Sequence, residues 1–383
     1  MMKKIFVLQF SPRSSDNCGI GKYQENFINI FYDYTEIETK FFDPSPYKTR
    51  LMDQDEFDVV KAKLAKELES YDILHIQHEF TLYSGNQFAQ IVNIAKSMGK
   101  RVVVTVHTSP TLIFNFKPRS SSAIINYLRK KRFHLKVNKN HIYPMRKVDL
   151  LITHNKGATN SVKNYGVGVH KILQTTIPVL KLAHPRHMST EITDRLRLKP
   201  EDIVYATVGF MHENKNIIDA VKALKYLPNY YKLAIIGGMH PTNNEANIYN
   251  SITDFIDKEE LKDRVYITGF VKDDDQLNAL IREVDICVYP YSNMYYGQVS
   301  SGALNLAFAN ECPVITYPTD SFKELNEEFN HITITNTSAY YEIAREIMRI
   351  DKENLVNASA KFSEKYSLQN VAKDILKAYQ KLI

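Results

Sequence analysis

A short segment in the second half of the chain carries groups that suit a phosphate. The apolar run Ile203–Val208 ends at Gly209, and Lys215 stands six residues later at the start of a predicted helix. Glycine lets a backbone approach a ligand closely, and an ammonium beside free backbone N–H groups suits a diphosphate. A surface lysine near a helix cap explains the same residues, so this loop alone leaves both interpretations open.

A second phosphate candidate lies about ninety residues further on. Small residues open a predicted helix there, where several backbone N–H donors are exposed together. The residues of this helix start are Ser300, Ser301, Gly302, Ala303 and Leu304. An N-cap serine before an ordinary packed helix is the alternative.

Two glycines, Gly19 and Gly21, follow the first predicted strand and open a helix. The dinucleotide fingerprint needs a third glycine, and Gln24 stands in its place, which disfavours NAD. Tight turns also use glycine for steric reasons alone.

Histidines end two predicted strands of the first half. His107 closes the run Arg101–His107, and His78 and Glu79 follow the run Asp72–Gln77. Strand ends in a parallel α/β sheet are the usual place for ligands, which favours a functional His107. A histidine that is only a hydrogen-bonded part of the core is the alternative.

The elements that position these residues form two α/β series. Short apolar runs alternate with helical patterns, which predicts right-handed βαβ units and parallel sheets covered on both faces. This alternation of apolar runs and helical patterns breaks near residues 180–200. We therefore expect an N-terminal Rossmann-like domain over 1–180, a second over 181–366, and a last helix over 367–383 that packs back on the first domain.

Composition is that of an ordinary globular protein. The 383 residues are 44% hydrophobic and 24% charged, and no apolar run is long enough to span a bilayer. Three widely spaced cysteines form neither a disulfide framework nor a metal knuckle. We expect a cytoplasmic protein without a signal peptide.

Positive charge gathers in one segment. Residues 112–147 contain ten Lys and Arg and no acidic residue, whereas the whole chain carries only +6. Such a segment could lie on an anionic membrane at the inner face, which would suit a lipid-linked acceptor. A solvated helix face is the alternative. Nucleic acid is not expected, because no nucleic-acid module is present.

Taken together, the segments resemble the retaining family 4 glycosyltransferases of GT-B fold, the glycosyl transferases group 1. The resemblance spans nearly the whole chain, and its specificity lies in the joint order of the pieces. They are Gly19–Gly21, Asp72–Glu79, Val104–His107, Gly209–Lys215, Ile267–Val271, Asp285–Pro290, Ser301–Leu304, Pro313–Thr316 and Phe322–Leu325.

The resemblance implies two Rossmann-like domains that face each other across a cleft. It implies transfer of a sugar from a nucleotide-diphosphate sugar to a glycan or lipid-linked acceptor hydroxyl, in glycan or polysaccharide assembly, with retention and without a metal or other cofactor. Lys215 and Ser300–Leu304 would hold the donor phosphates, and Gly19–Gly21 would line the cleft. His107 would face the sugar, and His78 and Glu79 would lie on the acceptor side.

The sequence departs from the family pattern at three positions. The two glutamates that the family usually has correspond to Gln298 and Leu306, and an arginine often found after the loop glycine corresponds to Phe210. Gln298 can still hydrogen-bond a sugar and is the second catalytic candidate. Leu306 cannot bind a ribose hydroxyl, although Asn305 could substitute. A non-catalytic GT-B homologue that binds sugar or a partner enzyme, and a sugar-nucleotide epimerase, are the alternative functions.

Overall fold

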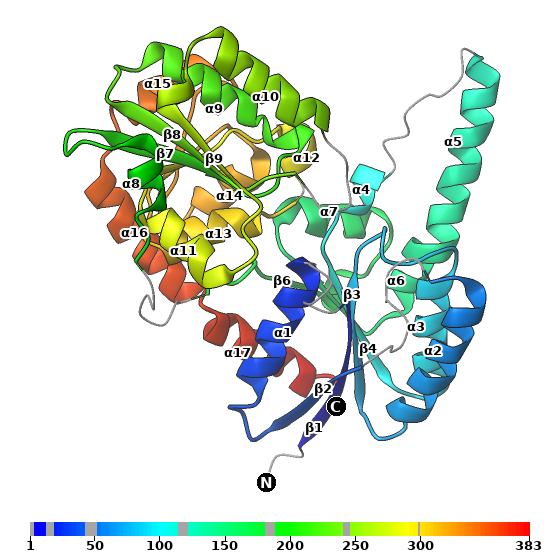
Figure 1. Ribbon diagram of the computed structural model, residues 1–383. Coiled ribbons are helices and arrows are strands. Elements are labelled where there is room, and N and C mark those ends of the chain that lie inside the picture. The colour runs from blue at the N-terminus through cyan, green and yellow to red at the C-terminus, as the bar shows by residue number, and fades with distance from the viewer. Residues whose placement is uncertain are drawn as a thin grey trace. The chain divides into compact units, whose positions relative to one another are not determined.

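The computed structural model describes residues 4–12, 19–42, 52–113, 122–180, 188–239, 246–297 and 299–383. The chain divides into two compact units (Figure 1). The first unit comprises Met1–Thr176, Gln298–Ser300 and Leu368–Ile383, and the second comprises Ile177–Gly297 and Ser301–Ser367. The predicted linker at 181–187 lies outside the described residues.

The first unit contains a six-stranded sheet in the order β2-β1-β3-β4-β5-β6, parallel throughout. Its inner strands β3, β4 and β5 are buried along almost their whole length, as expected where helices cover both faces of a sheet. The strands are β1 (Ile5–Phe10), β2 (Ile37–Phe41), β3 (Ile73–His78), β4 (Arg101–Val106), β5 (Leu150–Thr153) and β6 (Ile172–Gln174). The helices are α1 (Gly19–Phe31), α2 (Gln54–Leu68), α3 (Gln87–Ser97), α4 (Pro110–Ile113), α5 (Ala123–Val137), the π-helix η2 (Asn138–Ile142), α6 (Tyr143–Lys147), α7 (Lys156–Asn164), η3 (Val169–Lys171) and α17 (Leu368–Gln380).

The second unit contains another parallel six-stranded sheet, in the order β12-β11-β10-β7-β8-β9. The strands are β7 (Ile203–Val208), β8 (Tyr231–Ile236), β9 (Val265–Gly269), β10 (Ile286–Tyr289), β11 (Val314–Thr316) and β12 (Thr333–Ile334). The helices are α8 (Glu191–Leu196), η4 (Glu213–Lys215), α9 (Ile217–Ala223), η5 (Leu224–Tyr226), α10 (Ala246–Lys258), η6 (Lys262–Arg264), α11 (Asp274–Arg282), α12 (Asn293–Tyr296), α13 (Gly302–Ala309), α14 (Asp320–Asn326), α15 (Tyr340–Ile347) and α16 (Lys352–Lys365).

The strand orders place one switch point in each sheet. In the first unit the order reverses between β1 and β3, and in the second between β7 and β10. Ligands of doubly wound sheets bind outside the carboxyl ends of strands at such a point. The prediction of two doubly wound α/β units is therefore confirmed, and the topology selects the loops after β1, β3, β7 and β10.

The last helix, α17, belongs to the first unit, where Figure 1 draws it beside α1. Its apolar residues fall on one face, and Val371, Ile375 and Tyr379 are buried. The rings of Phe31 and Tyr379 lie 6.1 Å apart, and the Tyr34 hydroxyl donates to the Gln369 carbonyl. Buried apolar area of this kind is what stabilises a surface helix in a folded domain.

Residues 123–137 of the basic segment form α5, which extends away from the sheet of the first unit in Figure 1. Residues 114–121 of this segment lie outside the described residues. Ser122 caps its N-terminus by accepting from the Ile125 amide, as expected for a serine at this position. Nearly every residue of α5 up to Arg132 is exposed. No helix among the described residues is long and apolar enough to cross a membrane.

His331 in the second unit is fully buried between the rings of Phe308 and Phe362, at 4.8 and 4.2 Å. Burial lowers its pKa from 6.5 to about 4. Between these two pH values the unfolded chain binds a proton that the folded chain excludes. The stability of the folded state is therefore fully present above pH 6.5 and falls as the pH decreases toward 4.

We predict that His331→Phe makes the unfolding free energy less dependent on pH between 6.5 and 4. The wild-type unfolding free energy should fall by up to about 1.4 kcal/mol per pH unit from this histidine alone, and the variant should lack that contribution. Urea unfolding at pH 7.5, 5.5 and 4.5 measures the slope. Equal slopes for the two proteins would contradict the prediction, and the pH 7.5 values give the packing cost of the substitution separately.

Candidate functional site

The end of β7 brings two of the predicted phosphate-binding segments together. Gly209 has φ = +112°, and a Cβ at this position would lie 2.6 Å from Lys215 Nζ and 3.6 Å from Ala303 Cβ. Only glycine combines this backbone conformation with so close an approach. The Lys215 ammonium therefore lies over the bare α-carbon of Gly209, beside the first turn of α13.

The loop that carries Lys215 is fixed at both sides. The Ser292 amide donates to the Asn214 carbonyl at 2.8 Å, and Asn216 Nδ2 donates to the Pro290 carbonyl at 3.0 Å. Asn216 itself is left-handed (φ = +46°), so the helix α9 begins only at Ile217. Lys215 thus belongs to a 3₁₀ turn clamped to the residues after β10, rather than to the helix start that the sequence predicts.

Tyr291 contacts both segments, although it is not among the residues predicted from the sequence. Its ring centroid lies 5.6 Å from Lys215 Nζ, a cation–π distance. Burial raises the pKa of Tyr291, and a hydrogen bond with the Ser301 side chain acts in the opposite direction. The position of Tyr291 directly after β10, at the switch point, was the available signal.

The start of α13 is open. Ser301 caps the helix by accepting from the Leu304 amide at 3.4 Å, and Tyr289 anchors it by donating to the Ala303 carbonyl at 2.7 Å. Gly302 is exposed, and a Cβ there would meet nothing within 4 Å. The first turn of a helix leaves backbone N–H groups available to an anion, so Lys215 and α13 form one electropositive site.

Ser300, the residue before the N-cap Ser301, is grouped with the first unit. Its hydroxyl donates to the His154 carbonyl at 3.1 Å and accepts from Asn155 Nδ2 at 3.2 Å. Gln298, the second catalytic candidate, lies outside the described residues.

His107 follows β4 in the first unit and is partly buried. Its Nε2 lies 2.8 Å from Gln77 Oε1, and its ring stands edge-on to Tyr23 at 5.2 Å. Burial, then the nearby rings of His154 and His75, hold the pKa of His107 well below its ordinary value. The imidazole is therefore neutral at pH 7, where it can exchange hydrogen bonds with a ligand but carries no positive charge.

Comparison with known proteins now identifies the second unit. Residues 188–367 match the family glycosyl transferases group 1. The second unit is a glycosyl transferases group 1 domain. The Lys215 site lies inside the matched residues, and the first unit lies outside them except for Ser300 and its neighbours.

The fold of the whole chain is the GT-B fold, shared with solved glycosyltransferases. HepE of Anabaena in complex with UDP is 14% identical with a TM-score of 0.67, over 99% of this chain and 100% of that one. Sucrose-phosphate synthase of Thermosynechococcus elongatus is 13% identical with a TM-score of 0.69, over 99% of both chains. A glycosyltransferase of Rickettsia africae is 12% identical with a TM-score of 0.72, over 99% and 98%. No curated protein matches the chain.

The two acceptor-side candidates, His78 and Glu79, have different surroundings in the first unit. His78 is fully buried, with Nε2 3.0 Å from His141 Nδ1 and its ring against Phe80 and Phe88. Glu79 follows the strand and accepts hydrogen bonds from the Thr108 hydroxyl and, at 2.9 Å, from the Phe80 amide. Burial raises the pKa of Glu79 and these bonds oppose the rise. Glu79 thus contacts Thr108, the residue after His107, whereas His78 lies in the core.

Unpartnered polar atoms gather around His107. Among the described residues, the Tyr23 hydroxyl, Gln24 Nε2 and both ring nitrogens of His154 are buried without a hydrogen-bond partner. Buried polar groups are normally paired, so such a group of atoms marks a place for a ligand or an ordered water. Tyr23 lies in α1, two residues after Gly21. His154 directly follows β5 as His107 directly follows β4, so the same rule would have found it.

Asn305, the substitute that the sequence suggested, holds the first residue of the second unit, because its Nδ2 donates to the Ile177 carbonyl at 2.6 Å. Leu306 is partly exposed, and Phe210 stacks on Phe270 at 5.5 Å with an interplanar angle of 11°. An aromatic pair therefore stands where the family often has an arginine.

We predict that the ends of β7 and β8 tolerate no side chain at Gly237. This residue has φ = +137°, and a Cβ there would lie 2.2 Å from the Gly209 carbonyl oxygen. Gly237→Ala should lower the unfolding free energy by roughly 1–3 kcal/mol. Urea unfolding at pH 7.5 measures the loss, and Gly302→Ala, which meets nothing within 4 Å, is the matched control. Equal stability of the two variants would contradict the close approach.

Proposed function

We propose that the chain transfers a sugar from a nucleotide-diphosphate sugar to an acceptor hydroxyl in glycan assembly. The observation that carries the proposal is the Lys215 ammonium held over Gly209 beside the start of α13, within a glycosyl transferases group 1 domain. Bound UDP in the similar HepE structure supports a nucleotide-sugar donor. The sugar and the base stay open.

In this proposal the donor diphosphate lies between Lys215 and the first turn of α13, formed by Ser301, Gly302, Ala303 and Leu304. A lysine and a helix N-terminus stabilise negative charge as it develops on the leaving diphosphate, which is why we propose transfer without a metal. Retention of the anomeric configuration rests on the resemblance to family 4 enzymes.

The other predicted residues keep proposed roles. Gly19 and Gly21 begin α1, where a bare backbone can approach a ligand, and Ser300 and Gln298 precede α13. His107 would hydrogen-bond the sugar as a neutral imidazole. Glu79 would line the acceptor side, and the buried His78 would support it from the core.

Lys215→Ala tests the donor site. Hydrogen bonds to charged groups are worth about 1.5–3 kcal/mol, so donor binding should weaken roughly 10- to 100-fold. A thermal-shift screen against UDP-, GDP-, ADP- and dTDP-sugars finds the donor, and titration of each protein gives the affinity. Lys222→Ala is the matched control, because Lys222 lies in α9 with its ammonium 5.6 Å from the Tyr340 ring.

The result also separates the alternative functions. Unchanged donor affinity in Lys215→Ala would overturn the phosphate site. Donor binding without transfer to any acceptor would favour a non-catalytic homologue, the alternative that Gln298 and Leu306 support. Conversion of the donor sugar without an acceptor would favour an epimerase.

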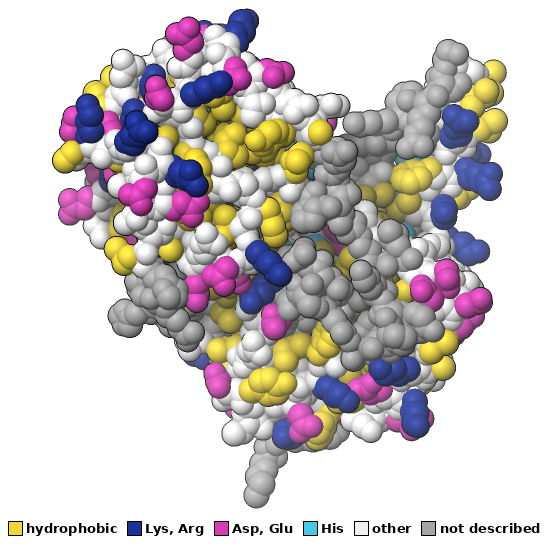
Figure 2. Space-filling model, in the orientation of Figure 1, with side chains coloured by type: hydrophobic (Ala, Val, Ile, Leu, Met, Phe, Trp, Pro, Cys, Tyr) yellow, Lys and Arg dark blue, Asp and Glu magenta, His cyan; other side chains and the backbone are white. Residues whose placement is uncertain are grey.

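We propose that α5 places the protein on an anionic membrane at the inner, cytoplasmic face, where a lipid-linked acceptor would be available. Ile124, Leu128 and Leu135 fall within about 40° of one another around the helix and are 73%, 57% and 62% exposed. Five cations flank them, and Figure 2 shows dark blue and yellow side chains together on this helix. An exposed apolar stripe with cationic flanks is typical of interfacial helices.

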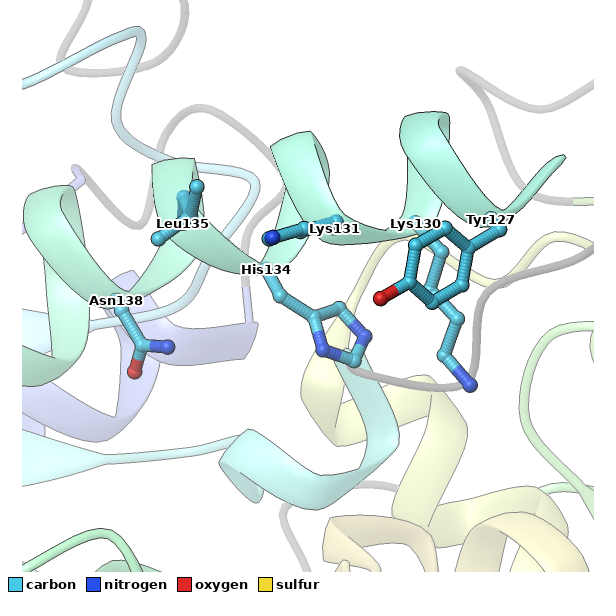
Figure 3. Close-up of a pocket in the computed structure, with 6 residues that line it drawn as sticks. All are labelled: Tyr127, Lys130, Lys131, His134, Leu135 and Asn138. Atoms are coloured by element: carbon cyan, nitrogen blue, oxygen red, sulfur yellow. The ribbon is translucent and has the colours of Figure 1, made fainter. Parts of the chain in front are cut away.

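A shallow pocket of about 300 Å³ adjoins the stripe and suits a lipid phosphate. Its lining residues come from successive turns of one helix face (Figure 3): Tyr127, Lys130, Lys131, His134, Leu135 and Asn138. The figure shows Tyr127, Lys130 and His134 directed to the same side of the helix. Two ammonium groups and several hydrogen-bonding side chains are suitable partners for phosphate oxygens.

We predict that the chain sediments with vesicles containing anionic lipid but not with neutral vesicles. Ile124→Gln with Leu128→Gln should reduce binding by at least about tenfold, because each buried apolar side chain contributes roughly 1.5 kcal/mol or more. Val59→Gln removes an exposed apolar residue of α2 and is the control. Salt should weaken binding. Equal binding by all three proteins would contradict the role of α5.

A further inference from the structure

A chain of buried hydrogen bonds runs from the last helix to His107. The Tyr379 hydroxyl lies 2.6 Å from His75 Nδ1, His75 Nε2 lies 3.3 Å from Gln77 Nε2, and Gln77 Oε1 lies 2.8 Å from His107 Nε2. The side chains of Tyr379 and Gln77 are fully buried, and His75 is 4% exposed. These hydrogen bonds therefore link Tyr379 of α17, through buried side chains of β3, to the partly buried His107 at the end of β4.

The direction of each hydrogen bond follows from the atoms involved. The oxygen of the Gln77 amide has no proton, so His107 must donate from Nε2. The nitrogen of that amide can only donate, so His75 Nε2 must accept, as it can also accept from the Thr105 hydroxyl at 2.8 Å.

Both imidazoles are neutral, because burial lowers the pKa of His75 to about 3 and that of His107 well below its ordinary value. A neutral imidazole carries one proton. His75 therefore has its proton on Nδ1 and donates it to the Tyr379 oxygen, and His107 has an unprotonated Nδ1.

We propose that Tyr379 is a positioning residue that fixes the tautomer of His107 through His75 and Gln77. The Nδ1 atom of His107 is thereby kept as a hydrogen-bond acceptor, which suits a sugar hydroxyl. Only this last step rests on the proposed function.

Removal of the Tyr379 oxygen should reverse the direction of the remaining hydrogen bonds between His75, Gln77 and His107. His75 Nδ1–H would lose its acceptor inside the core, so the proton would favour Nε2, where Thr105 accepts it. The Gln77 amide would then face a donor and would turn its oxygen toward His75. In the wild type Gln77 Nε2 also donates to Gln24 Oε1, so the Gln24 amide would turn as well and donate from its Nε2. The Gln77 nitrogen would donate to His107 Nε2, and the His107 proton would move to Nδ1. The acceptor at His107 would become a donor.

The experiment is nitrogen-15 NMR of the histidine rings in the full chain, assigned with His75→Gln and His107→Gln samples. Ring nitrogens with and without a proton have well-separated chemical shifts. In the wild type we expect a proton on Nε2 of His107 and on Nδ1 of His75. The opposite tautomers in the wild type would overturn the proposal without any need for a variant.

In Tyr379→Phe we expect both tautomers to be inverted, with the fold checked by thermal unfolding. Tyr23→Phe is the matched control, because it also removes a buried hydroxyl beside His107 but one without a hydrogen-bond partner among the described residues. Unchanged tautomers in folded Tyr379→Phe, or inversion in Tyr23→Phe as well, would overturn the relay.

Sugar transfer gives the functional consequence separately. Tyr379→Phe should lower kcat by about tenfold or more, while the thermal shift with donor is retained because Lys215 is unaffected. Inverted tautomers with unchanged transfer would support the relay and contradict the role of His107 in the proposed function. If no donor raised the melting temperature of the wild type, the proposed function would be contradicted. The tautomer result would still hold.

Discussion

Parallel pairing of the strands, twelve in the part of the chain that the structure describes, is the constraint on which the rest of the structure depends. In a parallel sheet every carboxyl end lies at the same edge, and each helix must return the chain to the opposite edge. The reversals of strand order between β1 and β3 and between β7 and β10 then leave open places at that edge. Gly209, Tyr291 and the start of α1 stand there because the topology puts them there.

The apolar pattern was sufficient to predict the strands of both sheets. Runs such as Val102–Val106 have no polar face, so they predict strands buried on both sides, and the glycine and histidine that follow them mark their ends. The helix α7 was missed because its core face consists of Ala158, Thr159, Ser161 and Val162, which are mostly small or polar and give no helical period. Helix α16, with few large apolar residues, was missed for the same reason.

The site could be predicted only in part. Gly209, Lys215 and the start of α13 were recognised because a strand end, a cation and small residues each have a local signature. Tyr23 and Gln77 have none, since their roles depend on which side chains the fold brings beside them. The close approach of Gly237 to the Gly209 carbonyl is likewise a contact between two strand ends that no spacing along the chain reveals.

The place of Tyr379 in the first unit has a consequence for the order of folding. A ribosome releases residues 368–383 only after the entire second unit, so the first unit lacks α17 while most of the chain is being made. Until then His75 lacks the Tyr379 hydroxyl at Nδ1 and Phe31 lacks the Tyr379 ring. The N-terminal unit, although synthesised first, is thus the later of the two to reach its final core, in contrast to the usual progression of domains along a nascent chain.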